Sequence, residues 1–180
     1  EAVMQLAREA GRLDIMVNNA AWVRYQPLAE ITPEVMDRMV EIGFKSVIWG
    51  IQAAAEAMDA ERGGTIVNVA SIAGFKSPTR SVVYSGIKAG VLGITRAAAA
   101  DLGGRNIRVN AVAPGAVPTE GTAKHRNAEL DARRIARTPL RRLGTVEEIA
   151  DAICFLAGDA ARFLNAEVLR LDGGASETSL

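Results

Sequence analysis

Residues 63–71 read GGTIVNVAS, and they precede SVVYSGIKAGVLGITRAAAADLG (81–103) and NIRVNAVAPG (106–115). The first and last of these stretches are short, rich in Val and Ile, and bounded by Gly or Pro-Gly, which is typical of buried strands. The middle stretch is long, apolar at helical spacing and closed by Gly103, so it predicts a helix. A strand, a helix and a strand in this order predict a βαβ crossover and a parallel sheet.

The same alternation continues on both sides of this unit. Further helices are expected over 1–11, 32–58 and 145–158, and further strands over 13–18 and 166–174. The helix at 32–58 contains Gly43 as a weak point, and residues 116–140 are expected to be polar and irregular. The predicted fold class is therefore α/β: one domain over residues 1–180 with a doubly wound, mostly parallel, Rossmann-like sheet covered by helices on both faces.

Composition excludes several classes of function. The formal net charge is +0, so nothing electrostatic favours nucleic acid or an anionic membrane as a partner. No apolar run approaches the ~20 residues of a membrane span, and no signal-peptide pattern opens the chain, so a cytoplasmic location is expected. One cysteine, Cys154, and one histidine, His125, cannot form a tetrahedral zinc site, and no metal is expected. His125 lies in a polar stretch and is expected to be solvated rather than catalytic.

Small and polar residues follow three of the expected strands. The sequence reads NNAA at 18–21, AS at 70–71 and PG at 114–115. None of these segments fills a core well. Because ligands of parallel α/β sheets bind beyond the carboxyl ends of the strands, these segments predict a ligand site at that edge.

Tyr84 and Lys88 are four residues apart in the helix expected over 81–103, so they share one face. A phenol has a pKa near 10, and a nearby cation lowers it by favouring the phenolate. Such a Tyr can donate a proton to a carbonyl oxygen or accept one from an alcohol. Ser71, at the end of the preceding strand, could hold the reacting oxygen. Taken alone, the Tyr-Lys spacing also fits an ordinary solvated helix face.

The combination of motifs is more specific than the Tyr-Lys pair, because Ser71 lies thirteen residues before Tyr84 and the motifs follow one another in a fixed order. They read LDIMVNNAA, IVNVASIAG, YSGIK, IRVNAVAPGAVPT and PLRRLGTVEEIADAICFLAGDAARFLNAEVLRLDGGAS. Over its whole length the chain resembles the short-chain dehydrogenase/reductase family in its shorter, single-domain form. The resemblance implies an NAD(P)-dependent oxidoreductase that interconverts an alcohol and a carbonyl of a small molecule by hydride transfer.

The resemblance also implies roles for named residues. Tyr84 is the implied acid/base, Lys88 lowers its pKa and binds the nicotinamide ribose, and Ser71 positions the substrate oxygen. The cofactor is NAD or NADP, which the sequence does not distinguish. The residues implied to bind it are Asn18, Ala20, Tyr84, Lys88, Pro114, Gly115, Val117 and Thr119.

Three departures from the family pattern matter. Ala21 replaces a usual Gly, and Gly43 stands where the family places a catalytic Asn, whose role runs largely through a main-chain carbonyl that glycine keeps. The Gly-rich turn that binds pyrophosphate is missing, so we expect a fold that lacks the first βαβ units and a partial sequence of a longer enzyme. The strand at 13–18 would then have an open apolar edge. Two alternatives remain: a non-catalytic or inactive fragment, and an epimerase or dehydratase of the extended family.

The polar segment 116–140 resembles the family's substrate lid, and a cluster of basic residues lies within and just after it. This cluster could meet an anionic substrate or phosphate, although a solvated or inter-subunit face is the favoured interpretation. Its members are Arg133, Arg134, Arg137, Arg141 and Arg142. Trp22, Tyr25 and Trp49 could line a pocket, but packing is the commoner role of aromatic residues. The helix over 81–103, apolar nearly all round, suggests subunit contacts, and the family resemblance implies a homotetramer.

Overall fold

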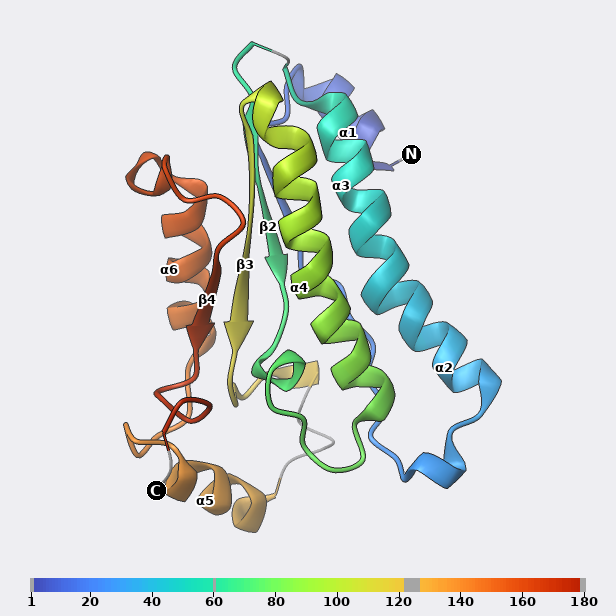
Figure 1. The fold of residues 1–180 in the computed structure, drawn as a ribbon, viewed down its shortest axis with the longest axis vertical. Coiled ribbons are helices and arrows are strands. Elements are labelled where there is room, and N and C mark those ends of the chain that lie inside the picture. The colour runs from blue at the N-terminus through green and yellow to red at the C-terminus, as the bar shows by residue number, and fades with distance from the viewer. Residues whose placement is uncertain (1, 60, 122–126, 179–180) are drawn as a thin grey trace.

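The computed structural model describes residues 2–59, 61–121 and 127–178. Figure 1 shows the arrangement of its helices and strands. The helices are α1 (Ala2–Ala10), α2 (Pro33–Val40), α3 (Ser46–Ala57), α4 (Val82–Leu102), α5 (Ala128–Arg137) and α6 (Val146–Ala157). The strands are β1 (Ile15–Asn18), β2 (Gly64–Val69), β3 (Ile107–Pro114) and β4 (Val168–Leu171). His125 lies outside the described residues, so the prediction made for it stays a prediction.

The four strands form one sheet in the order β1-β2-β3-β4, and all three pairings are parallel. Val67 in β2, for example, pairs with Val17 of β1 on one side and with Asn110 of β3 on the other. The predicted parallel α/β fold is confirmed. On the outer side of β1 no described strand pairs with it, and Ile15 and Val17 of that strand are partly exposed.

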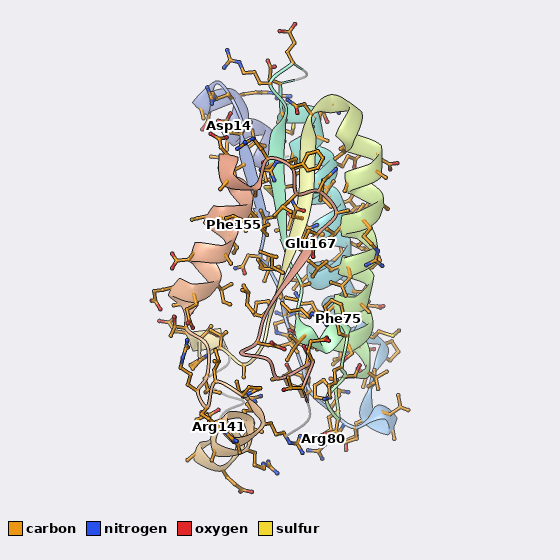
Figure 2. The ribbon with its side chains drawn as sticks, turned by 60° about the vertical axis from the view of Figure 1, so that its left-hand side comes forward. Asp14, Phe75, Arg80, Arg141, Phe155 and Glu167 are labelled. Atoms are coloured by element: carbon orange, nitrogen blue, oxygen red, sulfur yellow. The ribbon has the colours of Figure 1, made fainter. Side chains whose placement is uncertain are left out.

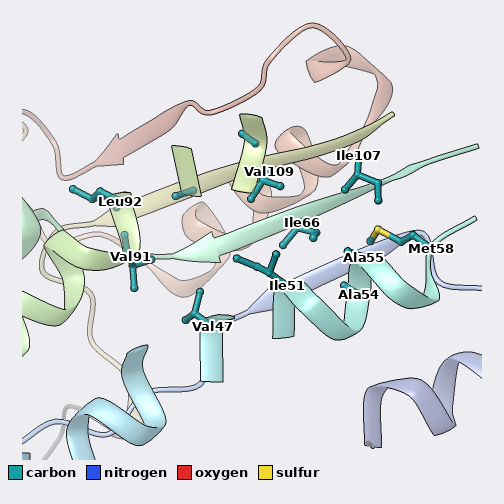
Figure 3. Packing of buried hydrophobic residues seen from close by; sticks show 14 residues of the cluster. Val47, Ile51, Ala54, Ala55, Met58, Ile66, Val91, Leu92, Ile107 and Val109 are labelled. Carbon is teal, nitrogen blue, oxygen red and sulfur yellow. The ribbon is translucent and has the colours of Figure 1, made fainter. Parts of the chain in front are cut away.

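Helices cover both faces of the sheet, with α3 and α4 on one side and α6 on the other (Figure 1). The side chains of β2 alternate between the two layers, as the pleat of a strand requires. Ile66 packs in the larger core cluster with Ile51 and Val91 (Figure 3), whereas Val67 packs with Leu156 of α6. The doubly wound architecture is therefore present in the described chain.

Buried amides and a hydroxyl connect two strands to a helix inside this core. Asn18 donates from Nδ2 to Oδ1 of Asn68 at 2.8 Å, and Asn68 donates in turn to Oγ1 of Thr95 at 3.0 Å. Thr95 donates to the carbonyl of Val91 at 2.8 Å. Asn68 and Thr95 are fully buried. This network, which we call the Asn18–Asn68–Thr95 network, links the carboxyl end of β1 through β2 to α4.

The helix predicted over 32–58 is interrupted at the expected weak point. α2 ends at Val40, a π-helical turn follows at Glu41–Lys45, and α3 begins at Ser46. Gly43 lies inside the π-helical turn and is buried. A Cβ at this position would lie 3.1 Å from Cγ2 of Ile87 in α4, so glycine permits close packing of the two helices here.

The prediction that 116–140 is irregular is wrong for its second half, because residues 128–137 form α5. Asn127 is the N-cap of this helix, and its side chain accepts the N–H of Leu130 at 2.7 Å. Acidic residues stand in the first turn and basic residues in the last, which suits the helix dipole. None of its residues is fully buried, and charged residues dominate its sequence, so it reads as a polar segment although its few apolar residues keep to one side.

α4 is more one-sided than its sequence suggests. Ile87, Val91 and Thr95 are buried against the sheet and α3, while Gly86 and Arg96 on the other side are exposed. The sequence predicts that other parts of the protein cover both sides of this helix, but within the described residues of one chain only one side of α4 is covered. None of the described helices is long and apolar enough to cross a membrane.

Candidate active site

A hollow of about 1140 Å³ lies at the carboxyl ends of the strands. In Figure 1 the arrowheads of β2, β3 and β4 point toward the end of the molecule at which α5 lies. Phe75, Arg80 and Arg141, from segments far apart in the sequence, lie at this same end (Figure 2). Ser71, Tyr84 and Gly115 line the hollow together with residues of α5. The structure thus places a large cavity where the strand-end segments predict a ligand site.

The three predicted catalytic residues lie together at this end of the sheet. Ser71 lies two residues beyond the end of β2, and Tyr84 lies in the first turn of α4. Both residues line the hollow, and the Ser71 side chain acts to lower the pKa of the Tyr84 phenol. Lys88, one turn further along α4, is 4% exposed and donates from Nζ to the carbonyl of Val69 at 2.7 Å. Its Nζ lies 5.9 Å from the centroid of the Tyr84 ring.

A glycine in the connection between β2 and α4 permits this arrangement. Ser71 is the N-cap of a 3₁₀ turn at Ile72–Gly74, and its Oγ accepts the N–H of Ala73 at 3.1 Å. A Cβ on Gly74 would lie 2.9 Å from the carbonyl carbon and oxygen of Lys88. Because no real Cβ approaches a backbone so closely, only glycine lets the turn lie directly against α4, which brings Ser71 beside Tyr84.

The protonation of the pair differs from the prediction made from spacing. Burial raises the pKa of Tyr84 above its ordinary value of 10.0, and the Ser71 hydrogen bond offsets part of that rise. Burial also lowers the pKa of Lys88 from 10.5 to about 8. The sequence predicts that Lys88 lowers the pKa of Tyr84, but in the structure removal from water dominates both groups. Tyr84 is consequently protonated at neutral pH, as a proton donor must be.

An aromatic neighbour adjoins Tyr84 in the hollow. The rings of Tyr25 and Tyr84 meet edge to face with their centroids 5.7 Å apart. Burial raises the pKa of Tyr25 to about 12, with the positive charge of Arg134 acting in the opposite direction. Tyr25, for which the sequence favours simple packing, is therefore part of the site wall. No local signal in the sequence could have shown this, because Tyr25 and Tyr84 belong to separate elements.

The residues predicted to bind a cofactor fall into two groups. Gly115 and Val117 line the hollow beside Ser71 and Tyr84. The described lining does not include Asn18, Ala20, Pro114 or Thr119. The Asn18 side chain is instead used inside the core by the Asn18–Asn68–Thr95 network. Its side chain thus steadies the sheet, and its predicted place beside the cofactor stays a prediction.

Comparisons with known proteins give a consistent result. The family model described as "Enoyl-(Acyl carrier protein) reductase" matches residues 1–176. The 3-oxoacyl-[acyl-carrier-protein] reductase FabG of Thermotoga maritima is 38% identical over 174 residues, which cover 97% of this chain and 70% of the relative. The crystal structure of a Serratia marcescens short-chain dehydrogenase/reductase mutant superposes with a TM-score of 0.88 at 35% identity, covering 97% of this chain and 72% of that one.

The chain belongs to the short-chain dehydrogenase/reductase family. The chain is also similar to the crystal structure of a gluconate 5-dehydrogenase from Burkholderia cenocepacia in complex with NADP and tartrate. It superposes with a TM-score of 0.94 at 30% identity and covers 99% of this chain and 70% of that one. Family membership confirms the resemblance carried by the sequence motifs.

As a short-chain dehydrogenase/reductase, this chain departs from the family pattern at Gly43. The departure coincides with the π-helical turn at Glu41–Lys45, and such turns are frequent at functional sites. Gly43 packs against Ile87, which is the residue before Lys88. The irregularity in the helix is thus present without an Asn side chain at position 43.

Proposed function

We propose that this protein is an NAD(P)-dependent oxidoreductase that interconverts an alcohol and a carbonyl. The observation that carries the proposal is that Ser71 and Tyr84 line one hollow, large enough for a substrate, at the carboxyl ends of the strands, with Lys88 buried one helical turn behind Tyr84. The names of the relatives agree with it, because a 3-oxoacyl reductase and a gluconate dehydrogenase both act at a carbonyl or alcohol carbon.

In the proposed reaction Tyr84 exchanges a proton with the substrate oxygen. Its raised pKa keeps the phenol protonated, which suits donation to a carbonyl in the direction of reduction. The Ser71 hydroxyl, next to the phenol, donates a second hydrogen bond that orients the same oxygen. Lys88, when protonated, stabilises the phenolate that is left behind after proton donation.

The strand-end residues fit the nicotinamide end of NAD or NADP. Gly115, Ala116 and Val117 are small or short, and they line the same hollow as Tyr84, so a flat ring can approach the substrate side of the phenol. Lys88 and Tyr84 would meet the nicotinamide ribose. Bound nicotinamide supplies or accepts the hydride. The preference for NAD or NADP is measured by comparing kcat/KM with NADH and with NADPH.

Reduction of a carbonyl is favoured over reduction of a carbon–carbon double bond. The matching family model is described as an enoyl reductase, whereas the T. maritima relative is named a 3-oxoacyl reductase. Ser71 and Tyr84 are neighbouring residues that each carry a hydroxyl group. Two neighbouring hydroxyl donors can both bind a carbonyl oxygen that gains negative charge. Turnover of a ketone but not of the matching compound with a carbon–carbon double bond in its place is the expected result.

The test is turnover by the purified chain, followed by the absorbance of reduced nicotinamide, with NADH and NADPH and a panel of ketones. Tyr84→Phe should lower kcat by about 10²- to 10⁴-fold while leaving the melting temperature nearly unchanged. Unchanged turnover in this variant would remove Tyr84 from the acid/base role. A folded wild-type protein without turnover would favour the inactive alternative, and isomerisation or dehydration without net oxidation of cofactor would favour the extended-family alternative.

We also propose a homo-oligomer, with a tetramer as the expected state. In the isolated chain, the side chains of Val146 and Phe155 on α6 are partly exposed to solvent, and that of Phe163 is fully exposed. Their exposure supports contact with a second copy at this face. Light scattering of the purified chain measures the mass directly, and a monomer at micromolar concentration would contradict the proposal.

A further inference from the structure

The hollow is positively charged. Among its described lining residues five are basic and two are acidic. The basic ones are Lys76, Arg134, Arg137, Arg142 and Arg170, and the acidic ones are Glu148 and Asp172. Most of the basic residues come from the segment that follows β3, far in sequence from Tyr84.

Both acidic residues and two of the basic ones already have close partners. Arg142 donates to Glu148 in a two-pronged ion pair, with Nη1 2.9 Å from Oε2. Arg170 pairs with Glu177, which is not part of the lining. Asp172 accepts the N–H groups of Gly174 and Ser176 at 2.9 and 2.8 Å. Within residues 2–59, 61–121 and 127–178, no ion pair involves Lys76 or Arg137, and Arg134 has only the 3.6 Å pair with Asp131, so these three basic residues supply the charge that can face a ligand.

Arg134 is the basic residue tied most directly to the reacting centre. Its charge acts on the phenol of Tyr25, whose ring lies against that of Tyr84. Its nearest charged partner in the described chain is Asp131, at 3.6 Å one turn away, which is a long and partly exposed ion pair. A guanidinium has five N–H donors, so one distant carboxylate leaves donors for a ligand. Arg137, three residues on, shares this face of α5.

The form of the site favours a carboxylate over a phosphate. Phosphates commonly bind free N–H groups at a helix N-terminus, and the N-terminus of α6 adjoins this hollow through Gly144. That position is already filled, because the Glu148 side chain accepts the N–H of Thr145 and Thr145 accepts the N–H of Glu148. What remains are planar arginine side chains, which match the two oxygens of a carboxylate.

We propose that the substrate is a hydroxy acid or oxo acid whose carboxylate is bound by Arg134, with Arg137 beside it on α5. This inference rests on the proposed oxidoreductase function. In reduction a hydride supplied by reduced nicotinamide would form a new C–H bond at the carbonyl carbon as the C=O π bond breaks, and the Tyr84 phenol would give its proton to the oxygen, which becomes the hydroxyl. The carboxylate takes no part in the bond changes, and its binding orients the carbonyl carbon toward Tyr84.

The experiment compares an oxo acid with its neutral methyl ester as substrates of the purified full chain, with NADH and NADPH. The wild type should reduce the acid with the higher kcat/KM. Arg134→Gln should lower kcat/KM for the acid about 10- to 100-fold, mainly through KM, and leave the ester nearly unchanged, because a hydrogen bond to a charged group contributes roughly that factor. Arg134→Lys should restore part of the loss. Arg133→Gln is the matched control, since Arg133 is exposed on α5 and does not line the hollow.

The two proposals fail in different ways. Equal turnover of ester and acid, or an equal loss for both in Arg134→Gln, would overturn the carboxylate site and leave the oxidoreductase proposal intact. Absence of turnover with every ketone would overturn both. A wild type that reduces only the acid, with a loss confined to the acid in Arg134→Gln, would support both.

Discussion

Replacement of Asn68 by alanine tests the buried Asn18–Asn68–Thr95 network. Asn68 is fully buried, accepts from Asn18 at 2.8 Å and donates to Thr95 at 3.0 Å. Alanine removes both hydrogen bonds and leaves the Asn18 amide as a donor that is 91% buried without its partner. Thr95 keeps its bond to Val91, so only one orphaned group results.

The expected loss follows from these contacts. An unsatisfied buried donor costs about 1–3 kcal/mol, and the second lost hydrogen bond about 1 kcal/mol. The free energy of unfolding should therefore fall by about 3 kcal/mol. For a domain of this size each kcal/mol shifts Tm by about 2–4 °C, so Tm should fall by about 6–12 °C.

Urea denaturation followed by circular dichroism measures the change. Asn19→Ala is the matched control, since Asn19 is the exposed neighbour of Asn18 and its replacement should stay within about 0.5 kcal/mol. Thr95→Val removes the other end of the network, and the double variant should lose less than the sum of the single variants. A loss below about 1 kcal/mol in Asn68→Ala, or strict additivity, would refute the network as a coupled element.

Three further predictions concern the residues around the site. The pKa of Lys88 falls from 10.5 in the unfolded chain to about 8 in the folded one. Between these pH values the unfolded chain binds the proton and the folded one does not, so the contribution of neutral Lys88 to the free energy of unfolding is complete above pH 10.5 and is lost as the pH falls toward 8. Unfolding free energy should rise by roughly 2 kcal/mol between pH 8 and roughly 9.5, and Lys88→Met should flatten that rise in urea titrations. Gly43→Asn should change kcat less than about tenfold, because the main-chain carbonyl is already present; a larger gain would show that the absence of the Asn side chain limits catalysis. Gly50→Ala should destabilise by about 1–3 kcal/mol, since its Cβ would lie 2.1 Å from Oδ1 of Asn18, whereas Gly86→Ala, in open space on α4, should be neutral or stabilising in thermal melts.

Local sequence signals predicted most of the fold. The capping box of Thr145 and Glu148 marked the start of α6, and the structure contains both of its hydrogen bonds. α5 is missed because its charged residues make 116–140 read as a polar loop, although the N-cap Asn127, the acidic first turn and the basic last turn all mark a helix. The split of the long helix near Gly43 was visible as a weak point but not as a π-helical turn, since the turn depends on packing against α4.

The site was predictable in part for a similar reason. Ser71, Tyr84 and Lys88 lie within one βα unit, so their meeting follows from a single connection. Tyr25 and Arg134 reach the same hollow from segments on either side of that unit, and only the three-dimensional fold brings them together. The direction of the Tyr84 pKa also needed the structure, because spacing shows the neighbouring cation but not the loss of water.

α5 has a consequence for how new specificities could arise in this protein. The helix carries none of the fully buried residues of the domain, yet two of its side chains face the substrate hollow. Substitutions there alter recognition while the sheet, the Asn18–Asn68–Thr95 network and the Tyr84–Lys88 pair keep their packing. Substitutions in this segment should therefore cost little free energy of unfolding. A laboratory library confined to residues 128–137 should yield many stable variants that differ in the substrates they prefer.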